Sequence, residues 1–292
     1  MTGIPLAPRK IKRRTLDPML SRFGIEIRRC SSELNHFMIS EKMRKKAIDL
    51  ATTAIGVFLD RAGHSVAANE LEAAVGGFYA LAPSCPVRQT SGGCGFNASL
   101  ELFVTARLLK PSVIVESGVY RGLTTWVLRQ AAPDAKIISF DIDLSRLQRT
   151  EVGVEYIEAD LSTYDFRLVS KKNALCFFDD HVSQALRIEQ ALSWGFGNLI
   201  FDDNYPTHCL HGDVLAPCPT IDMVFDDDLA EDELIEWQTN ACFQYRAGKA
   251  GLLALRDRIS FAERFPDLAT ATGYLAANLT YTRLRVPVSS KM

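Results

Sequence analysis

The sequence of 292 residues predicts an α/β protein, in which a parallel sheet with helices on both faces follows a helical N-terminal extension. From residue 98 onward, short apolar runs alternate with segments of helical periodicity, which is typical of buried parallel strands and their crossover helices. Five of these runs end in an acidic residue, at spacings close to one strand-helix unit. Residues 41–82 instead carry apolar residues at intervals of three and four, which indicates two helices with one buried face.

The expected elements follow one another in a regular order after residues 82–97, which read as a loop because of their Pro and Gly content. Strands are expected at 113–117, 136–141, 154–160, 174–180 and 197–203, and helices at 98–110, 122–131 and 182–193. Segments 250–257 and 280–288 are expected to add strands at one edge. We therefore divide the chain into an N-terminal extension with helices, residues 1–97, and a sheet domain, residues 98–292.

Composition and cysteine usage point to an ordinary globular chain. Apolar residues make up 47% of the sequence, which is enough for a full core. No run of eighteen apolar residues suggests a membrane span, and the N-terminus lacks the apolar centre of a signal peptide. The seven cysteines form no Cys-x-x-Cys pair, so we expect reduced thiols and a cytoplasmic location.

Charge is distributed unevenly along the chain. Residues 1–46 carry a net charge of +8, so that the remainder carries −10 within a total of −2. We favour a solvated tail over contact with an anionic surface such as lipid headgroups, which stays open as an alternative. No aromatic residues alternate with the basic ones, so a nucleic-acid partner is not expected. A homo-oligomer also stays open.

Five acidic residues close the apolar runs, and they are Glu116, Asp141, Asp160, Asp179 and Asp202. A single acid at such a place is often only a helix cap. Because parallel strands point the same way, five acids in register lie along one edge of one sheet. Ligands of open α/β folds bind at that edge, so the pattern predicts a binding site there.

The turn after the first strand reads Glu116-x-Gly118-x-x-x-Gly122, which differs from the Gly-x-Gly-x-x-Gly pattern that cradles a pyrophosphate. A carboxylate before the first glycine would repel phosphate and suits a ligand with an amine, such as S-adenosylmethionine. The glycines would let the backbone approach this ligand. Asp141 would bind ribose hydroxyls and Asp160 would lie near adenine. The alternatives are a helix cap for Glu116 and a plain strand-to-helix turn for the glycines.

A second group of acids follows the fourth and fifth strands, in CFFDDHVSQ (176–184) and LIFDDNY (199–205). Crowded carboxylates repel one another unless a proton or a cation lies between them. Oxygen ligands suit Mg²⁺, Mn²⁺ or Ca²⁺. The alternative is a metal-free site in which His181, with an ordinary pKa near neutrality, acts as the general base.

The motifs VIVESGVYRGLTTWVL, IISFDID and YIEADL resemble the first three motifs of class I S-adenosylmethionine-dependent methyltransferases. The branch that they resemble includes macrocin-type O-methyltransferases and cephalosporin hydroxylase-like proteins. The resemblance covers residues 98–203 well, 204–292 loosely and 1–97 hardly at all. It implies a Rossmann-like class I methyltransferase sheet with S-adenosylmethionine as cofactor, bound by Glu116, Gly118, Gly122, Asp141 and Asp160.

The same resemblance implies the second half of the site. Metal-dependent O-methyltransferases carry acids after strands four and five, which match Asp179, Asp202 and Asp203 as metal ligands. The neighbouring Asp180 leaves a register shift of one residue open. Asp179 and His181 are then the candidate catalytic residues, with His181 as the base.

We therefore expect an S-adenosylmethionine-dependent O-methyltransferase that acts on a hydroxyl of a small molecule, a sugar or a natural product, with help from a divalent cation. The N-terminal helices and the loop 204–229 would form the acceptor pocket. Two alternatives from other classes are a nicotinamide-dependent oxidoreductase on the same sheet and a catalytically idle cofactor-binding protein. Fold resemblance alone does not fix the reaction.

Overall fold

The structure is a computed structural model that describes residue 34 and residues 40–87, 92–208, 217–228, 234–238 and 244–286. The chain divides into two compact units, residues 1–31 and residues 32–292. All of the described residues belong to the second unit. The basic run at residues 9–14 therefore lies outside the described residues.

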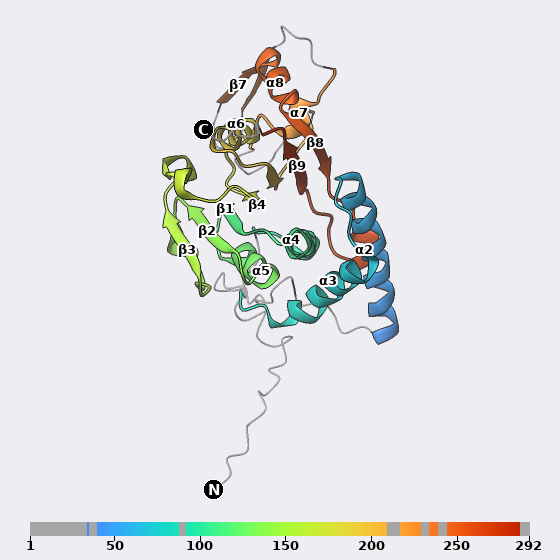
Figure 1. Ribbon diagram of the computed structural model, residues 1–292. Coiled ribbons are helices and arrows are strands. Elements are labelled where there is room, and N and C mark those ends of the chain that lie inside the picture. The colour runs from blue at the N-terminus through green and yellow to red at the C-terminus, as the bar shows by residue number, and fades with distance from the viewer. Residues whose placement is uncertain are drawn as a thin grey trace, which may run out of the picture. The chain divides into compact units, whose positions relative to one another are not determined.

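The main sheet has seven strands in the order β3-β2-β1-β4-β5-β9-β8, with β1 to β5 parallel and β9 antiparallel to both of its neighbours (Figure 1). The strands are β1 (Val113–Ser117), β2 (Lys136–Asp141), β3 (Val154–Glu158), β4 (Ala174–Phe178), β5 (Asn198–Phe201), β8 (Ile259–Arg264) and β9 (Thr280–Leu284). Chain order reverses between β1 and β4, which leaves a crevice at their carboxyl ends. The predicted Rossmann-like sheet is confirmed.

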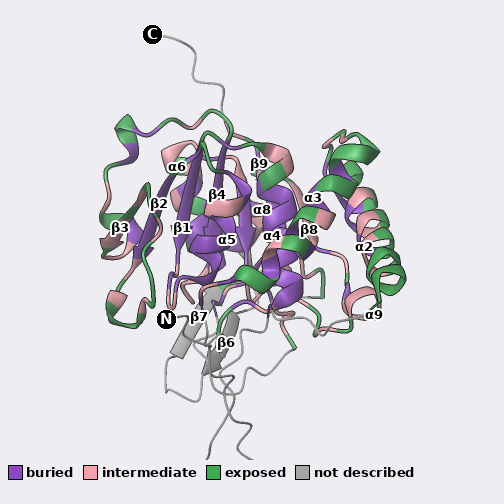
Figure 2. Ribbon diagram, turned by 90° about the horizontal axis from the view of Figure 1, so that it is seen from below, coloured by how far each residue is buried: buried purple, intermediate pink, exposed green. Residues whose placement is uncertain are grey.

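Helices cover both faces of this sheet. One face carries α2 (Glu41–Arg61), α3 (Ala68–Leu81), α4 (Phe96–Leu109) and α5 (Leu123–Ala131), and the other carries α6 (Gln184–Trp194), α7 (Ile221–Val224) and α8 (Lys249–Arg256). Short helices η1 (Ala82–Ser84), η2 (Leu144–Arg146), η3 (Leu161–Thr163), η4 (Phe166–Leu168) and α9 (Ala269–Thr272) lie in the connections. Figure 2 shows that the central strands are buried between the two layers.

Strand β1 shows how the apolar pattern sets the two layers. All five of its residues are buried. Val113 and Val115 pack on the α6 side, whereas Ile114 packs on the α5 side, because successive side chains of a strand point to opposite faces. Glu116 has the same parity as Ile114 and therefore points beneath α5.

The N-terminal helices α2 and α3 share one apolar core with α4 and α5, through residues such as Phe58, Phe78 and Phe96. Both helices were expected from the sequence and are confirmed. The division of the chain at residues 97 and 98 stays a prediction, although the helices on its two sides are packed together. None of the helices in the described part of the chain has the length and apolar character that a membrane span requires.

One expectation for the C-terminal part is wrong. Residues 250–257 were expected as an edge strand, but they form most of helix α8, in which Leu252 and Leu255 are buried at a spacing of three. That spacing fits a helix and not a strand. The edge strand is β8, and the predicted final strand is confirmed as β9. A separate two-stranded sheet pairs β6 (Leu234–Gln238) with β7 (Gln244–Gly248).

Candidate active site

The acids after β4 and β5 are placed by the last hydrogen bonds of the sheet. The Asp179 N–H donates to the Ser117 carbonyl at 2.8 Å, and the Asp202 N–H donates to the Phe178 carbonyl at 2.9 Å. Both residues therefore stand just beyond the ends of neighbouring parallel strands. Their side chains meet at the edge where ligands of α/β sheets bind.

Five side chains form what we call the Asp179 cluster. Ligand atoms of Cys94, Asp179 and Asp202 lie within 4.8 Å of one another, and so do those of Asp179, His181 and Asp203. Asp179 belongs to both groups. Within the cluster, Cys94 Sγ lies 3.3 Å from Asp202 Oδ2, and His181 Nδ1 lies 3.5 Å from Asp203 Oδ2.

The electrostatics of this cluster favour a proton or a cation. Burial and the charges of Asp202 and Asp203 hold the pKa of Asp179 well above its ordinary value. Burial and the charge of Asp203 raise the pKa of Asp202 to about 6. Among the described residues, no lysine or arginine forms an ion pair with Asp179, Asp202 or Asp203. This donor set of oxygen, nitrogen and sulfur fits a divalent cation.

The backbone around the cluster adopts left-handed conformations at residues other than glycine. His181 has φ 56°, Asp203 has φ 57°, and Tyr120 in the turn after β1 has φ 46°. Such conformations are uncommon for these residue types and persist where the surroundings fix them. Buried Gln184 contributes here, because it donates to the Asp202 carbonyl at 2.8 Å and accepts from the Ile221 N–H at 2.9 Å.

Glu116 does not lie at the open edge. Its side chain is fully buried, and it accepts hydrogen bonds of 2.6 Å from the hydroxyls of Thr124, Thr125 and Ser139. Burial raises its pKa, and the three hydroxyls offset part of that rise. Direct contact of Glu116 with a ligand amine finds no support in this geometry. The carboxylate instead fastens α5 and β2 to the end of β1.

The glycines of the turn have separate steric reasons. Gly118 has φ +97°, and a Cβ there would lie 2.2 Å from the Asp179 carbonyl oxygen. Gly122 has φ +85°, and its Cβ would meet a Leu147 methyl group at 2.6 Å. At both positions glycine is needed for the chain itself. Close approach of a ligand to these glycines stays a prediction.

Asp141 closes the turn from the neighbouring strand. Its Oδ2 accepts from the N–H groups of Val119 and Tyr120, both at 2.8 Å, and its Oδ1 accepts from the Asp143 N–H at 3.0 Å. The side chain is partly exposed at the carboxyl end of β2, next to the crevice between β1 and β4. A carboxylate has about four acceptor sites, so the ribose role predicted for Asp141 is compatible with these bonds.

Asp160 belongs to an ion-pair network. Buried Arg187 of α6 reaches Asp160 Oδ2 at 2.6 Å and Asp180 Oδ2 at 2.8 Å. Burial opposes the ionisation of Asp160, but hydrogen bonds from Arg187 and Ser162 outweigh it and lower the pKa of Asp160 to about 2. Ser117 Oγ also donates to Asp180 at 2.5 Å. Asp180 thus pairs with Arg187, and Asp179 is the acid of the pair that joins the cluster.

Three residues of this region are missing from the sequence-based set. Arg187 was detectable, because the helical period puts it on the buried face with Ile188 and Ala191. Cys94 gave only a weak signal in a glycine-rich loop. Glu101 of α4 is fully buried, and neither of its oxygens finds a hydrogen-bond donor in the described part of the chain. Burial and the charge of Asp202 raise the pKa of Glu101.

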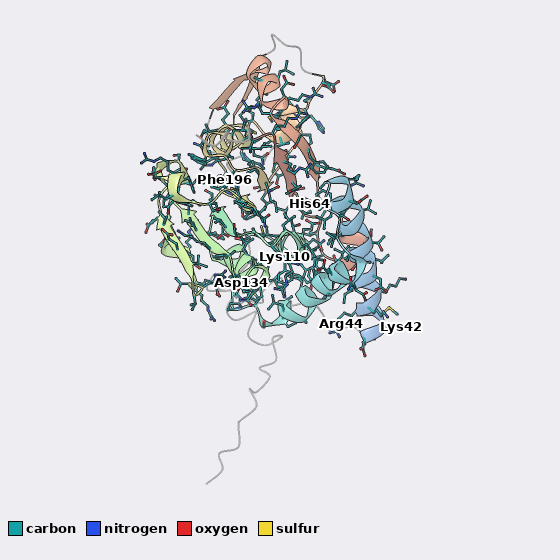
Figure 3. All side chains as sticks on the ribbon, in the orientation of Figure 1. Lys42, Arg44, His64, Lys110, Asp134 and Phe196 are labelled. Carbon is teal, nitrogen blue, oxygen red and sulfur yellow. The ribbon has the colours of Figure 1, made fainter. Side chains whose placement is uncertain are left out.

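Hollows in the structure lie at both edges of the sheet. Two small ones border the Asp179 cluster, one beneath His181 and Gln184 and the other between Cys94 and the turn after β1. A larger cavity of about 630 Å³ opens at the opposite edge, beside Lys110 and Asp134 (Figure 3). Because that cavity holds none of the strand-end acids, we assign the chemistry to the smaller hollows.

Comparison with known proteins gives similar structures only. No family model matches the chain, and no curated protein matches it. A structure of CmcI with Mg-SAM is 20% identical over 37% of this chain and 52% of that chain, about half of its length, with a TM-score of 0.30. The methyltransferase PaMTH1 of Podospora anserina, bound to SAH, is 15% identical over 98% of this chain and 100% of that chain, with a TM-score of 0.39.

The O-methyltransferase TomG of Streptomyces achromogenes, in complex with SAM, is likewise similar, at 15% identity over 92% of this chain and 95% of that chain, with a TM-score of 0.38. The motifs after the strands resemble the same class of enzyme. Because these TM-scores lie below 0.5, only the residues of this chain bear on the chemistry of its site.

Proposed function

We propose that the chain is an S-adenosylmethionine-dependent O-methyltransferase that acts on a hydroxyl group of a small molecule, a sugar or a natural product, with help from a divalent cation. The observation that carries this proposal is the arrangement of acids around the crevice between β1 and β4. Asp141 lies on one side of it, and carboxylates that no described lysine or arginine pairs with, Asp179, Asp202 and Asp203, lie on the other. A nucleoside ligand and a cation would thus meet at the crevice.

The cofactor half of the site rests on β1 and β2. Asp141 is placed to accept hydrogen bonds from ribose hydroxyls, while its contacts with Val119 and Tyr120 hold the turn. Glu116 acts from behind the turn through Thr124 and Thr125. The adenine role of Asp160 stays a prediction, because its carboxylate is already paired with Arg187.

The acceptor half of the site rests on β4 and β5. Asp179, Asp202 and Asp203 would hold the cation, which when bound lowers the pKa of a coordinated hydroxyl. His181 is one-third exposed and lies beside Asp203, so it can receive the proton of the acceptor hydroxyl. The protein would otherwise align the acceptor oxygen with the methyl group of S-adenosylmethionine for in-line displacement.

Two alternatives remain open as outcomes of a test. The charge of Glu116 disfavours a nicotinamide-dependent oxidoreductase because it would repel a pyrophosphate, although this carboxylate is buried behind the turn and does not face the edge directly. The missing Gly-x-Gly-x-x-Gly pattern still disfavours it. A catalytically idle binding protein would take up the cofactor without turnover.

Binding calorimetry distinguishes the proposed methyltransferase from a nicotinamide-dependent oxidoreductase. We expect S-adenosylhomocysteine to bind and NAD not to bind. Asp141→Asn should weaken the binding of S-adenosylhomocysteine by about 1–3 kcal/mol, the usual cost of losing a charge-assisted hydrogen bond. Asp165→Asn is the matched control, because Asp165 is an exposed acid of the β3–β4 connection whose ion pair is with the nearby Arg167. Equal affinity in both variants would remove Asp141 from the cofactor site.

An assay of methyl transfer tests two points: whether the chain is a catalytically idle binding protein, and whether activity requires the cation. The release of S-adenosylhomocysteine is measured with a panel of sugar and phenolic acceptors, before and after chelation with EDTA. We expect activity that chelation abolishes and a divalent cation restores. Activity that survives exhaustive chelation would leave His181 as the base of a metal-free site.

The remaining partner assignments stay predictions. These are the acceptor pocket formed by the N-terminal helices and loop 204–229, contact of the basic N-terminus with an anionic surface, a homo-oligomer and a cytoplasmic location. Residues 209–216 of that loop lie outside the described residues.

A further inference from the structure

Cys94 differs from two other described cysteines, Cys85 and Cys176, in what its sulfur faces. Cys85 lies 3.7 Å from the Val87 carbonyl oxygen, and Cys176 is buried in the middle of β4. Cys94 is only 4% exposed, yet its sulfur lies 3.3 Å from Asp202 Oδ2 and 3.9 Å from Asp179 Oδ2. A thiol is a weak hydrogen-bond donor, so these two contacts alone give little reason to bury sulfur beside two acids.

We propose that Cys94 is a sulfur ligand of the cation in the Asp179 cluster, and that the site therefore prefers a transition metal such as Zn²⁺ over Mg²⁺. This inference rests on the proposed function, because it assigns the ligand set and the metal class of the same site. It departs from the expectation of Mg²⁺, which binds through oxygen. Zinc accepts sulfur, nitrogen and oxygen ligands together.

The distances support a shared ion. With sulfur at about 2.3 Å and oxygen at about 2.1 Å from one ion, the two separations from Cys94 correspond to ligand angles of about 97° and about 125°. These angles lie on either side of the tetrahedral value. His181 and Asp203 form a separate group with Asp179, so the ion that Cys94 would bind takes Asp179 and Asp202 as its other ligands from this cluster.

The placement of Cys94 follows from the fold. It precedes α4 (Phe96–Leu109), a helix whose residues 96–106 are all buried beside the sheet. The start of that helix therefore brings the segment 93–95 against the carboxyl ends of β4 and β5. The thiol would release its proton to water when it binds, as zinc-bound cysteines do.

Cobalt provides a direct readout, because Co²⁺ bound to thiolate gives a charge-transfer band in the near ultraviolet besides its visible d–d bands. The full chain is stripped with a chelator and titrated with Co²⁺. We expect both kinds of band in the unchanged protein and in the control Cys85→Ser. Cys94→Ser should lose the sulfur band and keep the d–d bands from the remaining ligands.

Affinities provide the second measurement. In competition with a chromophoric chelator, Cys94→Ser should lower the affinity for Zn²⁺ and leave the affinity for Mg²⁺ unchanged. The loss of Zn²⁺ affinity should be at least about 10–100-fold, which is the usual cost of losing an outer-shell partner of a metal ligand. Cys85→Ser should leave both affinities unchanged. If Cys94→Ser fails to fold, the Co²⁺ spectrum of the unchanged protein still tests the proposal. In that spectrum, d–d bands without a sulfur charge-transfer band would overturn it.

The outcomes separate this inference from the proposed function. Co²⁺ binding that Asp202→Asn abolishes, with no sulfur band, keeps the cation site and removes Cys94 from it. No Co²⁺ binding at all, in a protein that binds S-adenosylhomocysteine, removes the cation and with it the sulfur ligand, while the cofactor assignment stands. Equal Zn²⁺ affinity in Cys94→Ser and Cys85→Ser also overturns the inference.

Discussion

Carboxylates after β1, β2 and β3 are surrounded by donors of the protein itself, whereas most of those after β4 and β5 face one another. Glu116 accepts from three hydroxyls, Asp141 from three backbone N–H groups, and Asp160 from Arg187 and Ser162. Asp179 and Asp202 instead lie beside Asp203 and the thiol of Cys94. The same residue type at equivalent strand ends thus occurs in two electrostatic states.

The difference shows which acids serve the fold and which are available to a ligand. Donors from the protein favour the ionised form of a carboxylate, and removal of those donors destabilises the chain. A crowded carboxylate is destabilised when ionised, so a proton or a cation gains free energy by binding there. Variants in the two halves should therefore change stability with opposite sign.

The largest effect is expected for Arg187→Met. This side chain is 1% exposed and pairs with Asp160 and Asp180, so its loss leaves two acids without their cation. The free energy of unfolding should fall by about 2–4 kcal/mol, below the cost of breaking a fully buried pair because Asp160 is partly exposed. Urea denaturation gives the measurement. Arg167→Met is the control, and because its ion pair with Asp165 is exposed, no measurable change is expected.

Glu116→Ala should cost about 2–3 kcal/mol in the free energy of unfolding, because three buried hydroxyls lose their acceptor. Glu116→Gln keeps one acceptor oxygen and should cost less. Calorimetry with S-adenosylhomocysteine under native conditions completes the test. A stable Glu116→Ala protein that has lost only cofactor affinity would restore Glu116 as a direct ligand.

Asp202→Asn should act in the opposite direction. In EDTA at pH 7 it should raise the free energy of unfolding by about 1–2 kcal/mol. The reason is that Asp202 has a pKa of about 6 in the folded chain and an ordinary pKa of 3.8, and only part of the free energy equivalent to that difference is expected to be recovered. Because the folded state binds this proton more tightly, the stability of the unchanged protein falls as pH rises from about 4 through about 6. The variant should lack that part of the fall. Thermal unfolding of both proteins at pH 4 to 8 measures this difference. If their stabilities depend on pH in the same way, the raised pKa of Asp202 is refuted.

The smallest effect concerns Glu101→Gln. The carboxyl is buried without a donor in the described part of the chain, and burial together with the charge of Asp202 raises its pKa, so folding favours its protonated form. Stability that this group contributes at low pH is lost as pH rises above its ordinary value. Glutamine removes the titration but still buries an amide, so the gain should be about 1 kcal/mol at pH 8. A destabilised variant at pH 8 would mean that Glu101 is ionised and paired in the folded chain.

The sheet was predictable because its strands are short apolar runs with regular spacing. β1 and β2 have the predicted bounds, and β3, β4 and β5 each end two residues before the predicted end. Residues 250–257 misled the prediction because a short apolar run alone does not distinguish a buried helix from a strand. The spacing of Leu252 and Leu255 was the signal that decides between them.

The site was predictable in its location but not in the direction of each side chain. The period of two along β1 already puts Glu116 on the face of Ile114, so its burial could have been foreseen. The choice between Asp179 and Asp180 needed the position of Arg187 on α6. Cys94 comes from a segment before α4 that no local pattern connects with β5, so only the tertiary structure brings it to Asp202.

The close approach of Gly118 to the Asp179 carbonyl has a consequence for binding energies. No atom larger than hydrogen fits between the turn after β1 and the backbone that carries Asp179, and the Asp179 N–H donates to the Ser117 carbonyl at 2.8 Å, so the two segments are held against each other. A ligand that fixes one of them therefore also fixes the other. The affinities for nucleoside and cation then share a coupling free energy, and by thermodynamic reciprocity each ligand raises the affinity for the other by the same factor.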